Sequence, residues 1–128
     1  MAWSFDAGRP IYLQLVEHIQ QKILNGEYQP GEKLPSVRDL AAEAAVNPNT
    51  MQKALSELER GGLVFAQRTS GRFITDDAAK IRRLRQAAAL AIARRFLADL
   101  NQLGITPNEA AALLDAAQTS YTRSDDSE

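Results

Sequence analysis

Apolar residues recur at helical spacing in three stretches of the first half of the chain. The first stretch begins at Pro10, whose missing N–H suits a first helical turn, and stops before Gly26. The second is about nine residues long and follows Ser36, a good N-cap. The third follows Asn47, another good N-cap, and ends at Gly61. The pattern predicts three helices, whose buried faces are formed by Tyr12, Leu15, Val16, Ile19 and Ile23, by Val37, Leu40, Ala41 and Ala44, and by Met51, Ala54, Leu55 and Leu58.

The second half of the chain predicts a β-hairpin followed by two more helices. Two short β-type runs at 63–66 and 72–75 flank a polar loop that contains glycine. A long helix is expected after Asp76 and ends before Gly104, and a capping box at Thr106 starts the last helix. The expected buried side of these helices consists of Ile81, Leu84, Ala88, Ala91, Leu97 and Leu100, with Ile92, Phe96 and Leu103 close by, and of Ala110, Leu113, Leu114 and Ala117.

Length and composition exclude several classes of protein. The 128 residues are 45% hydrophobic, enough for one ordinary domain. The 15 basic and 16 acidic residues leave a net charge of −1, which excludes a uniformly basic nucleic-acid coat. The absence of cysteine removes disulfides, thiolate catalysis and cysteine-ligated zinc. No apolar run is long enough to span a bilayer and the N-terminus does not resemble a signal peptide, so we expect a soluble cytoplasmic protein.

The composition changes near residues 75–77, where glycine and proline give way to alanine. We interpret 1–75 as a compact domain, 76–120 as a helical region and 121–128 as a disordered tail. Two helices cannot build a self-contained core, so a second copy of the chain is expected to complete it. The residues predicted to form this dimer interface are Ile81, Leu84, Ala88, Ala91, Ile92, Phe96, Leu100, Leu113 and Leu114.

Two helices joined by a tight turn and followed by a hairpin make a winged helix-turn-helix. The predicted fold is therefore mainly α with a small β-hairpin: a winged helix-turn-helix domain plus a short C-terminal two-helix dimerisation element. In such a domain the second helix of the pair enters the DNA major groove, where polar side chains near its N-terminus reach base edges. The residues suited to that task are Asn47, Asn49, Thr50, Gln52 and Lys53. Asn and Gln pair bidentately with adenine, and Thr bonds a base or touches a thymine methyl.

Local charge supports a DNA-binding surface, because six basic and four acidic residues between Lys33 and Phe73 leave an excess of two positive charges. Alternatives remain for individual residues. An ion pair with a nearby acidic side chain is the alternative for Arg38, and helix capping is the alternative for Asn47. The basic run at 80–85 is either a solvated face or a set of phosphate contacts beside the wing.

Three motifs together resemble the GntR family of bacterial transcription regulators: PIYLQL at 10–15, PGEKLPSVRDLA at 30–41 and VNPNTMQKALSELE at 46–59. The Asn-Pro-Asn-Thr turn and the short helical C-terminal region are similar to the YtrA-type subfamily. Many family members carry arginine where Pro48 and Gln52 stand, so the operators of better-known subfamilies are not carried over. Thr69 replaces the first glycine of the family's Gly-x-Gly wing.

The resemblance implies a homodimeric transcription regulator, a repressor, that binds a palindromic operator in double-stranded DNA. It also implies that Arg38 contacts DNA, that the third helix reads the operator and that residues 68–72 form the wing. An unidentified small-molecule effector is left open. The family resemblance and the polar pattern together define a predicted DNA-binding set. Its members are Lys33, Ser36, Arg38, Asn47, Asn49, Thr50, Gln52, Lys53, Arg68, Thr69, Ser70, Gly71 and Arg72.

The competing functions are a winged-helix module that binds protein rather than specific DNA, and an enzyme. An apolar patch on the third helix would favour the protein-binding module, but the residues there are polar. We expect no enzyme, cofactor or metal, because the sequence holds no nucleophile–His–acid set, no Gly-rich phosphate loop and no metal cluster. His18, the one histidine, fits a half-buried helix position, and Trp3 and Phe5 are expected to pack on the domain or its partner.

Overall fold

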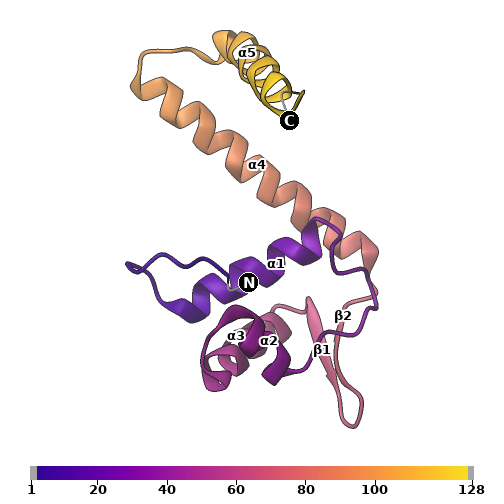
Figure 1. Cartoon of the computed structure of the whole chain (residues 1–128). Helices are drawn as coiled ribbons and strands as arrows, with labels where there is room; N and C mark the ends of the chain where they lie inside the picture. Colours follow the sequence, from indigo (N-terminus) through magenta and orange to yellow (C-terminus); the bar gives the residue numbers. More distant parts are fainter. Residues whose placement is uncertain (1–2, 127–128) are drawn as a thin grey trace. The chain divides into compact units, whose positions relative to one another are not determined.

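The computed structural model describes residues 3–126, and for 121–126 it describes the backbone alone. Over this range the elements follow the predicted order of three helices, a hairpin and two further helices (Figure 1). The chain divides into two compact units, the first ending at Arg85 and the second starting at Gln86. The elements are α1 (Ile11–Leu24), α2 (Val37–Ala44), α3 (Pro48–Arg60), β1 (Val64–Gln67), β2 (Gly71–Ile74), α4 (Ala78–Gln102) and α5 (Pro107–Asp126).

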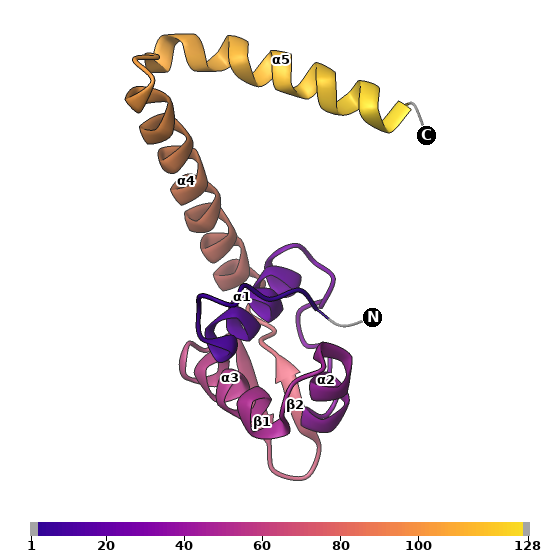
Figure 2. The ribbon, with the colours of Figure 1, turned by 60° about the vertical axis from the view of Figure 1, so that its left-hand side comes forward.

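The first unit is built around one apolar core to which α1, α2, α3 and the hairpin all contribute. Leu15 and Ile19 of α1, Met51 and Leu55 of α3 and Ile74 of β2 are completely buried. Their spacing matches the predicted buried faces, because residues three or four apart share one side of a helix. Figure 2 shows α2, α3 and the hairpin loop all on one side of α1.

The hairpin is antiparallel, with Val64 opposite Ile74 and Gln67 opposite Gly71. Each strand is displaced by one residue toward the loop relative to the predicted runs. The extended piece before α2 lies against β2, because the Ile74 N–H donates to the Glu32 carbonyl over 2.8 Å. Lys33 bridges to Phe73 in the same way. The wing is therefore tied to the segment that leads into α2.

The turn between α2 and α3 is as tight as predicted. The Ser36 hydroxyl accepts the Asp39 N–H at 3.1 Å and so caps α2. Ala45 ends α2 in the left-handed region at φ 59°, and the Val46 N–H donates back to the Ala41 carbonyl. Asn47 then caps α3 by accepting the Asn49 N–H at 2.7 Å.

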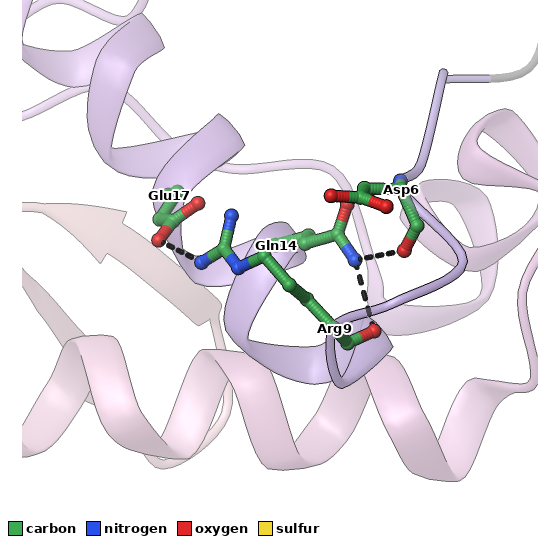
Figure 3. Close-up of polar contacts among 4 residues, drawn as sticks. All are labelled: Asp6, Arg9, Gln14 and Glu17. Carbon is green, nitrogen blue, oxygen red and sulfur yellow. Dashed lines mark hydrogen bonds and ion pairs between the residues drawn. The ribbon is translucent and has the colours of Figure 1, made fainter.

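The start of α1 differs in detail from the prediction. Pro10 is the N-cap with ψ 134°, outside the helical region, and the helix begins one residue later. The segment before α1 is folded back, because the Gln14 side-chain amide donates to the carbonyls of Asp6 and Arg9 (Figure 3). Arg9 also forms an ion pair with Glu17.

This fold-back settles where the N-terminal aromatic residues pack. Trp3 stacks on His18 of α1, with 3.9 Å between the ring centroids. Phe5 is partly buried against the core. Trp3 and Phe5 were expected to pack either on the domain or on a partner subunit. In the single chain they pack on the domain.

The first unit reaches ten residues beyond the expected boundary at 75. Ile81, in the first turns of α4, is only 8% exposed and belongs to the core, and Leu84 packs partly against it. The core of the first unit therefore already buries most of the Ile81 side chain, and its assignment to the dimer interface stays a prediction. The helical periodicity was correct, but it could not tell which surface covers this face.

The second unit contains the rest of α4 and all of α5. Gly104 has φ 78°, and the Ile105 N–H donates to the Leu100 carbonyl, which closes α4. Ala110 is buried, whereas several large apolar side chains predicted to be inward are exposed in the single chain. They include Leu97, Leu113 and Leu114, at 37%, 39% and 55% exposure.

The backbone of residues 121–126 continues α5, which ends at Asp126. The disordered tail expected at 121–128 stays a prediction. Extending a helix that has already formed costs far less than starting one, and α5 is nucleated by the turn at Thr106, whose carbonyl accepts the Glu109 N–H. Residues 127–128 lie outside the described range. Within the range that is described, the helices are too short or too polar to cross a membrane.

Candidate nucleic-acid interface

One face of α3 is polar and exposed along its length. Asn49, Gln52, Lys53 and Ser56 are exposed, whereas Met51 on the opposite face is completely buried. Thr50 is half-buried at the edge of this face. The face offers amide and hydroxyl groups that both donate and accept hydrogen bonds, as base-edge recognition in a major groove requires.

Two residues of the predicted set have roles inside the domain. Ser36 and Asn47 use a side-chain oxygen to cap α2 and α3. The capping alternative for Asn47 is thus what the structure shows, although its amide N–H₂ group is left to donate elsewhere. Both residues fix the N-termini of the two helices and so set the direction in which the polar face points.

Arg38 lies in the first turn of α2 and is exposed. The ion pairs among the side chains described, residues 3–120, are Arg9–Glu17, Arg60–Glu57 and Arg72–Glu59. Arg38 takes part in none of them, so the expected alternative of an intrachain partner is not seen in this part of the chain. Its guanidinium is available to bind a phosphate or a guanine edge.

The hairpin loop presents Arg68, Thr69 and Ser70, all exposed. Gly71 closes the loop at φ 100°, a conformation that favours glycine. A Cβ atom at Gly71 would lie 3.3 Å from Cε of Lys33, so the lysine stem runs beside the base of the loop. The structure thereby brings Lys33 and the loop residues together, although they are far apart in sequence.

Arg72 differs from the other basic residues of the set. Its Nε donates to Glu59 of α3 at 2.5 Å, and its side chain is only 20% exposed. Its charge is therefore largely used to tie β2 to α3. Glu59 was not among the predicted site residues, because nothing in a single sequence links two residues 13 positions apart on different elements.

Lys53 has an aromatic neighbour that the sequence analysis placed in the core. The Lys53 ammonium lies 3.8 Å from the ring centroid of Tyr12, in the first turn of α1. Tyr12 is half-buried, and the Lys53 ammonium lies over its ring. No local pattern could have revealed this pair, which depends on the packing of α1 against α3.

Other chemistry is not built into this surface. Over the residues that the structure describes, no group of three or more His, Asp or Glu side chains is placed to hold a metal ion. Nε2 of His18 is buried without a hydrogen-bond partner, and burial, together with Lys22, lowers the pKa of His18. His18 stacks under Trp3 and is not one of the exposed polar residues of α3.

Comparison with known proteins decides the family. The sequence profile described as "Bacterial regulatory proteins, gntR family" matches residues 11–74, half of the chain. The chain belongs to this family. It is 38% identical over 106 residues to the uncharacterized HTH-type transcriptional regulator YhcF of Bacillus subtilis, an alignment that covers 83% of this chain and 88% of that protein. It is 45% identical over 69 residues to the HTH-type transcriptional repressor YtrA of the same organism, covering 54% and 53%.

Solved structures extend the likeness of this GntR-family chain to the fold. A GntR family transcriptional regulator from Listeria monocytogenes superposes with a TM-score of 0.83 at 36% identity, covering 88% of this chain and 98% of that one. The N-terminal domain of AraR in complex with a mutant ORR3 superposes with a TM-score of 0.52 at 28% identity, covering 55% and 100%. The winged helix-turn-helix fold is thus confirmed. These relatives are named as transcription regulators, which argues against an enzyme.

Proposed function

We propose that this GntR-family chain is a repressor that binds a palindromic operator as a homodimer. The observation that carries the proposal is the exposed polar face of α3, which follows a capped α2 and is itself capped by Asn47. It is joined by Arg38, which forms no ion pair among the side chains of residues 3–120, and by the exposed Arg68 of the hairpin loop. A helix with such a face fits the major groove, and arginines on either side of it bind phosphates. The repressor role is inferred from the relative YtrA, which is named as a transcriptional repressor.

The predicted contacts divide by what they can read. Asn49, Thr50 and Gln52 are assigned to base edges, and Lys53 to a phosphate beside them. Arg38 is assigned to a phosphate or a guanine. Lys33 and the wing residues 68–70 are assigned to the sugar–phosphate backbone of the DNA. Ser36, Asn47 and Gly71 shape the surface, and Arg72 holds the wing in place.

The second unit supports a homodimer. Its exposed apolar side chains, which include Leu90, Ile92 and Leu103 at 47%, 71% and 75% exposure, form no core within the single chain. Exposed apolar surface of this kind is buried favourably by a second copy. A two-fold dimer would also present two polar faces, and a palindrome offers two equivalent half-sites.

Selection of bound sequences from random double-stranded DNA tests the proposal. We expect an enriched inverted repeat and an affinity that falls steeply with salt, because phosphate contacts release counterions.

Arg38→Ala should weaken binding to the selected site about tenfold or more through loss of a charge-assisted contact, whereas Arg94→Ala, an exposed arginine of α4, should not. Failure to enrich any sequence would refute specific DNA binding.

The competing protein-interaction module is not favoured by the surface of α3. Such a module needs an apolar patch on this helix, but the large apolar residues that α3 carries are buried. The exposed face would instead leave its amides and hydroxyls unpaired in an apolar interface. An affinity that does not change with salt concentration in the same experiment would favour the protein-interaction module.

A further inference from the structure

The contact between Lys53 and Tyr12 joins the polar face of α3 to the first turn of α1. The ammonium lies 3.8 Å from the ring centroid, within the range of a cation–π interaction. Lys53 itself is exposed, one helical turn after Asn49 and next to Gln52. The tyrosine ring therefore fixes a cation at the edge of the surface assigned to base reading.

Two basic residues of the predicted DNA-binding set, Arg72 and Lys53, are held by their neighbours in opposite ways. Arg72 is fixed by the carboxylate of Glu59, which neutralises its charge. Lys53 is fixed by a neutral ring, which leaves its full charge available to an anion. A free lysine has a flexible four-carbon stem and loses considerable rotamer entropy when it binds. A ring that holds the ammonium in advance removes part of that entropy cost.

We propose that Tyr12 is a positioning residue that presents the Lys53 ammonium to a DNA phosphate. This inference rests on the proposed function and adds to it a residue of α1 that need not touch DNA. When DNA approaches, water leaves the ammonium, and cation–π attraction is stronger for a desolvated cation. The ring and the phosphate then hold the same charge from two sides, so Tyr12 contributes more to the complex than to the free protein.

The test compares the affinity of four full-length proteins for the selected operator over a series of salt concentrations. Lys53→Met should weaken binding and lower the log–log salt slope by about 0.9, the value for one phosphate contact. Tyr12→Leu should weaken binding about fivefold with the slope unchanged, because the charge remains. Tyr12→Phe, which keeps the ring, should stay within about twofold of the natural protein.

A double-mutant cycle separates positioning from packing. Added to Lys53→Met, the Tyr12→Leu change should cost no further affinity, because there is no cation left to position. Proton NMR gives an independent signature: the ε-methylene protons of Lys53 should be shifted upfield by the ring in the natural protein and in Tyr12→Phe, but not in Tyr12→Leu.

If Tyr12→Leu does not fold, pentafluorophenylalanine at position 12 replaces it, since this residue keeps the shape of the ring and reverses its quadrupole. It should reproduce the fivefold loss. The inference is overturned if the natural protein binds its operator but loss of the ring leaves the affinity unchanged, or if Lys53→Met leaves the salt slope unchanged. Absence of operator binding by the natural protein would instead refute the proposed function.

Discussion

Ala45 occupies a conformation that its side chain disfavours. At φ 59° it ends α2, and a left-handed residue other than glycine costs roughly 1–2 kcal/mol. Glycine avoids most of this cost but loses about 0.5–1 kcal/mol of backbone entropy. We therefore expect Ala45→Gly to raise the free energy of unfolding by about 0.5–1 kcal/mol, as measured by urea denaturation. Ala42→Gly is the matched control, because Ala42 is exposed within α2 and should be destabilising by about 1 kcal/mol. Equal losses in both variants would show that Ala45 is not strained.

His18 gives the first unit a pH dependence. Burial, and then the charge of Lys22, lowers the pKa of His18 below its ordinary value of 6.5, while Glu27 and Glu43 act weakly in the opposite direction. The unfolded chain therefore binds a proton more readily than the folded chain. This contribution to stability is complete above about pH 6.5 and is lost as the pH falls toward the lowered pKa.

Thermal unfolding between pH 7.5 and pH 5 measures this contribution. His18→Phe keeps an aromatic ring under Trp3 and removes the titrating group. We expect the melting temperature of the natural protein to fall with pH over this interval and that of the variant to fall less. Parallel curves for the two proteins would show that His18 does not link folding to proton binding.

The Arg72–Glu59 ion pair couples the hairpin to α3. Both side chains are partly buried, at 20% and 31% exposure, so solvent screens this pair less than a surface pair. We expect Glu59→Gln to lower the free energy of unfolding by about 1 kcal/mol. Glu57→Gln is the control, because Glu57 pairs with Arg60, whose side chain is 76% exposed, and should cost less than about 0.5 kcal/mol. A similar loss in both variants would contradict a coupling role for Arg72.

The elements of this fold were predictable where local chemistry sets them. Ser36 and Asn47 marked the starts of α2 and α3 correctly, because capping needs only neighbours along the chain. Ile81 was placed on the buried face of α4, but its packing in the core of the first unit was not predicted, because periodicity does not identify what buries a face. The pairs Tyr12–Lys53 and Arg72–Glu59 depend on tertiary packing and have no sequence signal. The polar face of α3 was therefore predictable from the sequence. The contacts of Tyr12 and Glu59 with the basic side chains beside it were not.

At the scale of the whole molecule, the proposed dimer rests on the exposed apolar surface of the second unit. Leu113 of α5 and Leu13 of α1 make a matched pair, because each is a helical leucine with 39% of its surface exposed. Only Leu113 belongs to the predicted interface. A glutamate buried there without a partner would cost several kcal/mol, whereas one at Leu13 would stay in water.

Sedimentation equilibrium should therefore show that Leu113→Glu weakens dimerisation by about a hundredfold or more and that Leu13→Glu leaves it unchanged. DNA binding gives the second reading. The dimer should prefer a full palindrome to a single half-site by orders of magnitude, since its second half-site binds at a high effective concentration. The Leu113→Glu protein should lose most of that preference while keeping its affinity for a half-site, because α3 and Arg38 are unaltered. If the natural protein sediments as a monomer, the dimer is no part of the mechanism. If the Leu113→Glu protein retains the preference for a full palindrome, the dimer contact lies elsewhere in the chain.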